Sequence, residues 1–530
     1  MSKRVLMLAS LSSVLVFGTA EAADVVDGWT QTYVETVRSL IQTIGAPCRT
    51  SRSAAMMYLS MQDAVNSITH EYEPYVLEYS ASPTASKEAA ATTAAYEVMM
   101  GVYPTRAYLF DPRYEADLAA IPDGPEKEEG ILVGQAVAAA MLELRSEDGS
   151  ELVVEYEPIL EPGHWRPTWP EYRPPKDPGY GRVRPFGLYC ACQFPREEPP
   201  ALDSVEYFEN FEEVRIVGEQ HADMESTLEY EIGWFWANDQ DGTYKATGQM
   251  FLMAKAVADA ADLQFEDRVH FFGLYSLAMA DAAIAGWYAK YETDWDVWRP
   301  VTGIREADTD GNDLTIAQPD WIPISYVSPN FPGHVSGHAA FGGAAAQIFR
   351  RYLGTDEMDF VVPTSDPHLQ INWTREMHSF TQVETEIGDS RIYIGVHWPF
   401  ECDGGTVLGR QIGDWTIDNY LRPIDPLTAS VETTTPVVRL EPIYPNPTHA
   451  GATLRFASAT SGRLDIVIYD AAGRQVSLLG RSIQAGTAEI SWDGNGADGR
   501  PVATGVYFIR PTLEGEPVEL DGSGRLVVVR

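Results

Sequence analysis

The sequence has 530 residues, of which 77 are Asp or Glu and 38 are Lys or Arg, and its formal net charge is −39 at pH 7. A nucleic-acid-binding protein needs a basic surface that neutralises phosphates, and a protein that docks on anionic lipid needs one too. The charge therefore argues against both kinds of partner, and the length allows about two to four domains.

The N-terminal segment resembles an export signal. Lys3 and Arg4 form a basic start, residues 5–18 are apolar, and Ala20-Glu21-Ala22 is a small-x-small motif, as in a secretory signal peptide. The apolar run is too short to span a bilayer, and we identify no later uninterrupted apolar run of spanning length. We therefore expect residues 1–22 to be a signal peptide, and the mature protein to be soluble and secreted or held at the cell surface.

Residues 23–425 are predicted to form a mainly α-helical domain. Residues 268–291 are apolar nearly all round, which is typical of a buried central helix. Residues 336–354 predict another helix, with Ser336 as its N-cap and Gly354 as its stop. Further segments with helical spacing of apolar residues are 51–68, 84–103, 126–149 and 404–421.

Two segments break this helical pattern. From Pro158 to Pro200 the chain is too rich in proline for a helix or a central strand, so we expect a long loop that aromatic residues hold against the domain. Residues 426–437 indicate a linker. In residues 438–530 the apolar pattern changes to period two, with turn sequences between short strands, and this predicts a small C-terminal β-sandwich domain.

The cysteines leave alternatives open. Export makes disulfides plausible, and four cysteines allow three pairings. Cys190-Ala-Cys192 lacks the spacing of a zinc site. We interpret the cysteines as structural disulfides or buried thiols; they are Cys48, Cys190, Cys192 and Cys402.

Three segments carry side chains that together suit an oxyanion. Singly, each has an ordinary explanation: an Arg-Pro that stops a helix, a Ser-Gly-His cap, and a packed histidine. Together they bring three cations, the N–H groups of a helix start and two histidines to one place, which is the chemistry of a phosphate-like pocket with a proton carrier and a nucleophile or ligand. The residues are Lys290, Arg299, Ser336, Gly337, His338, Arg391 and His397.

Arg391 and His397 are six residues apart, so they would not share a face of a straight helix. Gly395 and Pro399 are predicted to let the backbone bend and bring the two side chains together.

These segments resemble the shared pattern of vanadium-dependent haloperoxidases and the related acid phosphatases, over roughly residues 28–422. Ser390 to His397 matches the third family motif, and residues 336–338 match the second, with Val335 where the family has proline. Lys290 lies two residues further from Arg299 than the family pattern, so residues within 292–296 would loop out. The resemblance implies a helical-bundle fold.

The resemblance also implies an activity: oxidation of chloride or bromide by hydrogen peroxide to hypohalous acid, with vanadate as cofactor and small organic molecules as acceptors. His397 would bind vanadium, His338 would act as acid–base partner, and Lys290 would also polarise the peroxide. Glu401 would orient His397. The vanadate oxygens would be held by Lys290, Arg299, Ser336, Gly337 and Arg391.

In this family, Trp287 and Phe331 would form one wall of a halide site, here called the halide wall, of the type found in chloroperoxidases. The alternative interpretation is that both are aromatic residues packed in the core. The tail resembles the sorting and Ig-like domains of bacterial proteins with type IX secretion, through YPNP at 444–447. That resemblance implies export machinery as a partner of the C-terminal domain.

Two other functions remain open: an acid phosphatase in which His397 becomes a phosphohistidine, and a non-enzymatic surface protein with a relic pocket. His334 has no matching role and is expected to be exposed. The segment DTDGND has carboxylate spacing that allows calcium, but Pro319 stands at the closing position, so a turn is preferred. The candidate calcium ligands are Asp308, Asp310 and Asn312.

Overall fold

The computed structural model describes two compact units, Met1–Ile424 and Asp425–Arg530. In the first it describes residues 25–41, 46–77, 79–370 and 373–424. In the second it describes residues 438–440, 448, 451–458, 461–470, 474–484, 486–497, 499–513, 516–517 and 525–528. The expected signal peptide and linker lie outside the described residues.

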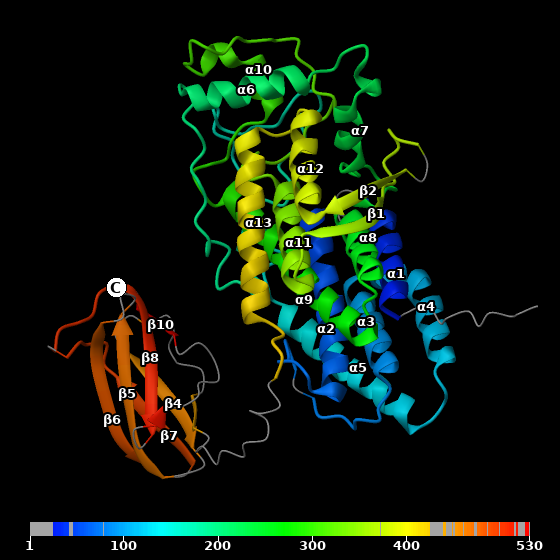
Figure 1. Ribbon diagram of the computed structural model, residues 1–530. Helices are drawn as coiled ribbons and strands as arrows, with labels where there is room; N and C mark the ends of the chain where they lie inside the picture. Colours follow the sequence, from blue (N-terminus) through cyan, green and yellow to red (C-terminus); the bar gives the residue numbers. More distant parts are fainter. Residues whose placement is uncertain are drawn as a thin grey trace, which may run out of the picture. The chain divides into compact units, whose positions relative to one another are not determined.

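The first unit is a helical bundle, which confirms the predicted fold class (Figure 1). Its first helices are α1 (Val25–Ser39), α2 (Pro47–Thr69), α3 (Lys87–Val102), α4 (Ala107–Ala120) and α5 (Pro125–Arg145). The next are α6 (Val205–Val217), α7 (Leu228–Phe235), α8 (Lys245–Ala260), α9 (Phe265–Tyr291) and α10 (Pro300–Arg305). The last are α11 (Gly337–Leu353), α12 (Phe380–Tyr393) and α13 (Pro399–Asn419). A hairpin that the sequence analysis missed, β1 (Glu357–Pro363) with β2 (Thr374–Ser379), precedes α12.

Helix α9 is the core of this unit, as its apolar composition predicts. It packs against α2, α11 and α13. Among the described helices it alone has the length and apolar character to cross a membrane, and that apolar stretch is completely buried inside the unit. Burial of a helix on all sides explains why its apolar residues follow no single stripe.

Helices α11 and α13 approach each other closely because glycines line their contact. A Cβ built on Gly409 would lie 2.2 Å from the Ala340 carbonyl oxygen, and one on Gly343 would lie 2.3 Å from the Thr406 carbonyl oxygen. Any side chain at either position would force the helices apart. This contact holds the first turns of α11 and α13 side by side, and Figure 1 shows the two helices adjacent.

Residues 146–204 form the expected long loop, with one short 3-10 turn at Tyr180–Arg182. The buried carboxylate of Asp281, on α9, accepts the N–H groups of Phe186, Gly187 and Leu188 at 2.6, 2.7 and 2.9 Å. The loop therefore covers α9, and the Asp281 side chain anchors three consecutive residues of it to that helix.

The second unit has two antiparallel sheets, as the period-two pattern predicts. One contains β10 (Arg525–Val528), β8 (Gly505–Leu513), β5 (Gly462–Asp470) and β6 (Gln475–Ile483), with β9 (Glu516–Pro517) paired to β8. The other contains β3 (Val438–Leu440), β4 (Ala452–Ser458) and β7 (Gly486–Trp492). Leu454, Ile466 and Trp492 are buried in a separate apolar core of this unit.

Asp281 makes stability depend on pH in a predictable direction. Burial raises its pKa from 3.8 to about 6, so its contribution to stability is fully present below the unfolded-state value and is lost as the pH rises through about 6. We expect wild type to gain roughly 3 kcal/mol relative to Asp281→Asn when the pH falls from 7 to about 4. Chemical denaturation of both proteins across this range measures the difference, and parallel curves would contradict the assignment.

Candidate active site

The predicted site residues meet at one end of the bundle. Trp287 and Lys290 lie in the last turns of α9, and Arg299 is the N-cap of α10. Arg391 lies in the last turn of α12, and Gly395, with a φ of 74°, turns the chain before α13 begins at Pro399. The predicted bend between Arg391 and His397 is therefore present, and Figure 1 shows α6 and α10 crossing this end of the bundle.

Lys290 lies inside the pocket despite its longer spacing from Arg299. Its ammonium donates to the carbonyl oxygens of Pro332, Gly333 and Val335 at 2.9, 2.8 and 2.5 Å. Residues 292–298 leave the helix and return, which absorbs the extra length. Burial and the neighbouring Arg299 lower the pKa of Lys290 well below its usual value.

Arg299 is completely buried and holds an unused donor. Its Nε donates to the Phe331 carbonyl at 2.9 Å, and its Nη1 donates to the Val396 carbonyl at 2.7 Å and contacts His397 Nε2 at 3.0 Å. Within the described part of the chain its Nη2 has no hydrogen-bond partner. A buried guanidinium donor without a partner is costly, and an oxyanion beside it would remove that cost.

The contacts of His397 determine its tautomer. Arginine only donates, so His397 Nε2 must accept from Arg299 and carries the lone pair. The proton then lies on Nδ1, which donates to Glu401 Oε2 at 2.6 Å. Burial lowers the pKa of His397 and raises that of Glu401 to about 8, and both shifts favour neutral groups over an ion pair. Glu401 thus orients a neutral imidazole whose unprotonated Nε2 could act as a ligand or nucleophile if the Arg299 hydrogen bond is exchanged for an oxyanion.

Ser336, Gly337 and His338 open helix α11, as predicted. The Ser336 hydroxyl accepts the Ala339 N–H at 3.4 Å, so the positive end of a 17-residue helix faces the site. His338 is half-buried, and its Nε2 lies 3.5 Å from Arg391 Nη1. Burial and Arg391 lower the pKa of His338 well below its usual value, so this imidazole is neutral.

The sequence analysis missed one acidic neighbour of the site, Asp239. Its Oδ2 lies 3.8 Å from Arg391 Nη1, and its side chain is 55% exposed. Partial desolvation raises the pKa of Asp239 above its usual value, and Arg391 opposes that rise. The signal in the sequence was the polar run NDQDG at 238–242 between two helices, which is also typical of an ordinary loop.

Trp287 and Phe331 form one wall beside the cations. Their ring centroids are 5.0 Å apart. The Phe331 ring lies 5.2 Å from Lys290 Nζ and 4.9 Å from the Arg299 guanidinium carbon. The two aromatics are therefore part of the site as well as of the core.

One expectation needs correction. His334 is 2% exposed and packs against Trp295 and Phe400, so the prediction of an exposed histidine is wrong. Burial lowers its pKa to about 3.

The possible calcium loop is a hydrogen-bonded turn. Asp310 accepts the Asn312 N–H and the Thr315 hydroxyl, both at 2.8 Å, and the Asn312 amide donates to two carbonyls. The side chains of Asp310 and Asn312 are thus already used in hydrogen bonds, and the described residues contain no cluster of acidic, histidine or cysteine side chains suited to a metal ion. The candidate ligands Asp308, Asp310 and Asn312 do not form a calcium site.

The geometry defines a class of protein: a helical bundle whose buried cations, helix start and neutral histidine suit a tetrahedral oxyanion. The unpartnered Arg299 donor and the lone pair on His397 Nε2 fit vanadate or phosphate. The oxyanion would be held by Arg299, Ser336, Gly337 and Arg391. Lys290, also predicted to hold it, would contribute its nearby charge, because its three N–H groups already bind main-chain carbonyls.

Comparison with known proteins agrees with this class. Residues 270–426 match the family model of the VCPO second helical-bundle domain, and residues 446–514 match the FlgD Ig-like domain. The chain is 26% identical over 360 residues to a vanadium chloroperoxidase from Curvularia inaequalis, covering 53% of this chain and 58% of that protein. Within the helical unit, residues 270–426 are therefore similar to the vanadium chloroperoxidase family.

Two solved structures share the fold. A bacterial vanadium-dependent iodoperoxidase has a TM-score of 0.62 at 24% identity, covering 76% of this chain and 96% of its own. A holo-type bacterial vanadium-dependent chloroperoxidase has a TM-score of 0.58 at 17% identity, and the match covers 74% of this chain and 96% of that chain.

Gly333 tests the orientation of Glu401. A Cβ at this position would lie 2.0 Å from Glu401 Oε1, so Gly333→Ala must displace the carboxyl that orients His397. We expect vanadate to bind the variant roughly 10–100-fold more weakly, which is the loss typical when a residue that hydrogen-bonds to a metal-binding histidine is displaced. Titration calorimetry measures this. Gly286→Ala, where the added Cβ meets open space, is the control and should bind as wild type does.

Proposed function

We propose that this protein is a vanadate-dependent haloperoxidase that oxidises chloride or bromide with hydrogen peroxide to hypohalous acid. The observation that carries the proposal is the His397 Nε2 lone pair, directed by Glu401 into a pocket of buried cations. The Trp287–Phe331 wall and the named relatives support a peroxidase over a phosphatase.

The roles of the residues follow from their contacts. Arg299 and Arg391 would hold the negative charge of the cofactor, and His397 Nε2 would bind its metal. When bound, vanadate would supply a Lewis acid that activates peroxide without a change of oxidation state. His338, neutral and half-buried, would accept and return a proton at Nε2. Trp287 and Phe331 would keep water from the halide.

A cofactor-dependence assay tests this function against the rival. The protein without vanadate should be inactive in halogenation, and vanadate with peroxide should restore bromide oxidation. Excess phosphate should slow the recovery because the two anions share shape and charge. Rapid phosphate-ester hydrolysis, with no vanadate-dependent halogenation for any halide, would instead make the protein a phosphatase with His397 as nucleophile. Loss of both activities would favour the non-enzymatic surface protein.

His397→Ala tests the ligand. It removes the proposed bond between the protein and the metal. Vanadate affinity should therefore fall by more than the roughly 10–100-fold that follows the loss of a residue that only orients the ligand. Equilibrium binding measures the effect, with His378→Ala, an exposed histidine on β2, as the matched control. Retained affinity in the His397 variant would assign the ligand elsewhere.

Phe331→His tests the halide wall. An imidazole would replace an apolar ring that lies over two cations, so chloride oxidation should fall roughly tenfold or more relative to bromide oxidation. The ratio of the two rates is its own control, since a folding defect would lower both. An unchanged ratio would leave Phe331 as a core residue only.

We further propose that the protein is exported, with residues 1–22 as the signal peptide and the C-terminal unit as the part that export machinery recognises. The basic-apolar-small pattern of the N-terminal segment supports the first statement. The match to an Ig-like domain and the YPNP motif at 444–447 support the second.

A further inference from the structure

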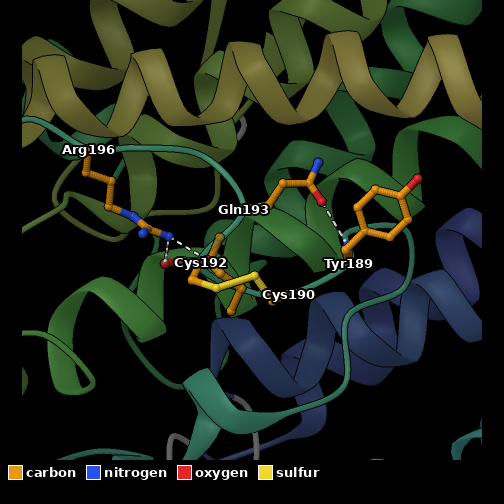
Figure 2. Close-up of a disulfide and its surroundings, with 7 residues drawn as sticks. Tyr189, Cys190, Cys192, Gln193 and Arg196 are labelled. Atoms are coloured by element: carbon orange, nitrogen blue, oxygen red, sulfur yellow. Dashed lines mark hydrogen bonds between the residues drawn. A yellow bond between two sulfur atoms is a disulfide. The ribbon is translucent and has the colours of Figure 1, made fainter. Parts of the chain in front are cut away.

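The disulfide lies outside the catalytic pocket and encloses a single residue. Cys190 and Cys192 are bonded, with only Ala191 between them, while Cys48 and Cys402 are buried free thiols. Figure 2 shows the bond on the loop that carries Tyr189, Gln193 and Arg196. The position is unusual for a structural crosslink because it joins no two elements.

The bond contributes little to holding the loop. A disulfide stabilises a fold mainly by closing a long loop in the unfolded chain, and this one closes a loop with a single intervening residue. Other contacts already anchor the segment: Asp281 accepts three of its N–H groups, and the Gly187 carbonyl accepts from Trp415 at 3.0 Å and from Tyr420 at 2.7 Å. These hydrogen bonds do not involve the disulfide, so we expect the loop to keep its conformation when the disulfide is reduced.

The bond is also accessible from solvent. Cys192 is exposed and Cys190 is half-buried. Arg196 donates to the carbonyl of Ala191 at 2.6 Å, between the two cysteines, and to the Ala285 carbonyl of α9 at 3.0 Å (Figure 2). A guanidinium beside the pair favours the thiolate of a reduced cysteine.

We propose that Cys190–Cys192 is a thiol–disulfide exchange site that small thiols open and close in the folded protein. An incoming thiolate attacks Cys192 Sγ, the bond between the two cysteines breaks, and Cys190 leaves as a thiolate that takes up a proton. A second thiolate attacks the sulfur of the first thiol, so Cys192 is released and a small-molecule disulfide forms. Two electrons pass from two thiols to the protein, and oxidised thiol reverses both steps.

This inference does not depend on the haloperoxidase function, and its test uses the full chain. The protein is incubated with millimolar reduced glutathione, the free thiols are alkylated, and each cysteine is quantified by peptide mass spectrometry. We expect Cys190 and Cys192 to be labelled while Cys48 and Cys402 stay unlabelled, with circular dichroism and Tm unchanged. Oxidised glutathione should then restore the disulfide. Labelling that appears only together with unfolding would overturn the proposal.

Trapping of the mixed disulfide identifies the attacked sulfur. Wild type treated briefly with reduced glutathione and quenched with acid should carry glutathione on Cys192 in several-fold excess over Cys190, as quantified by peptide mass spectrometry. Equal amounts, or an excess on Cys190, would overturn the assignment of Cys192 as the attacked atom. A Cys190→Ser, Cys192→Ser double variant should show the same Tm as wild type, and a large fall in Tm would show that the bond is a structural crosslink instead.

Discussion

The burial of two cations, Lys290 and Arg299, among main-chain carbonyl oxygens is the constraint on which the rest of this structure depends. Lys290 is held by three main-chain carbonyls, and Arg299 by two carbonyls and an imidazole nitrogen. Burial lowers the pKa of both side chains. Although the chain has 77 acidic residues, these two cations are held by neutral carbonyl oxygens, so their positive charge is not neutralised. An anion that binds beside them would offset the cost of their desolvation.

The packing of α11 on α13 places the other half of the site. Both helices begin at the pocket, so the positive ends of their dipoles add to the charge of the arginines. The Ser336 N–H donates to the Glu401 carbonyl at 2.8 Å and ties the two helix starts together. The glycine contacts of Gly343 and Gly409 permit this approach, so residues without any chemistry of their own position Ser336 and His397.

Asp239 and Glu401 show two ways in which acidic groups tune this positive site. Glu401 is buried, and burial raises its pKa, which favours the neutral carboxyl group. It therefore orients His397 without placing a full negative charge beside it. The Asp239 side chain is exposed, and its Oδ2 lies 3.8 Å from Arg391 Nη1, which is an ion-pair distance. The buried acidic group of the site is thus held towards its neutral form, while the exposed one lies at ion-pair distance from Arg391.

The sequence by itself determined the helical class, the β-rich tail and the candidate residues of the oxyanion site, because helical spacing, period-two patterns and short chemical motifs are local properties of the chain. It also predicted the bend at Gly395, since a straight helix would separate Arg391 from His397. Only the tertiary structure decided that Lys290 enters the pocket, that Asp239 joins it, that His334 is buried and that Cys190 pairs with Cys192. Each of these depends on the path of a loop, and loop paths are set by contacts with distant segments, such as the carbonyls at 332–335 that bind Lys290.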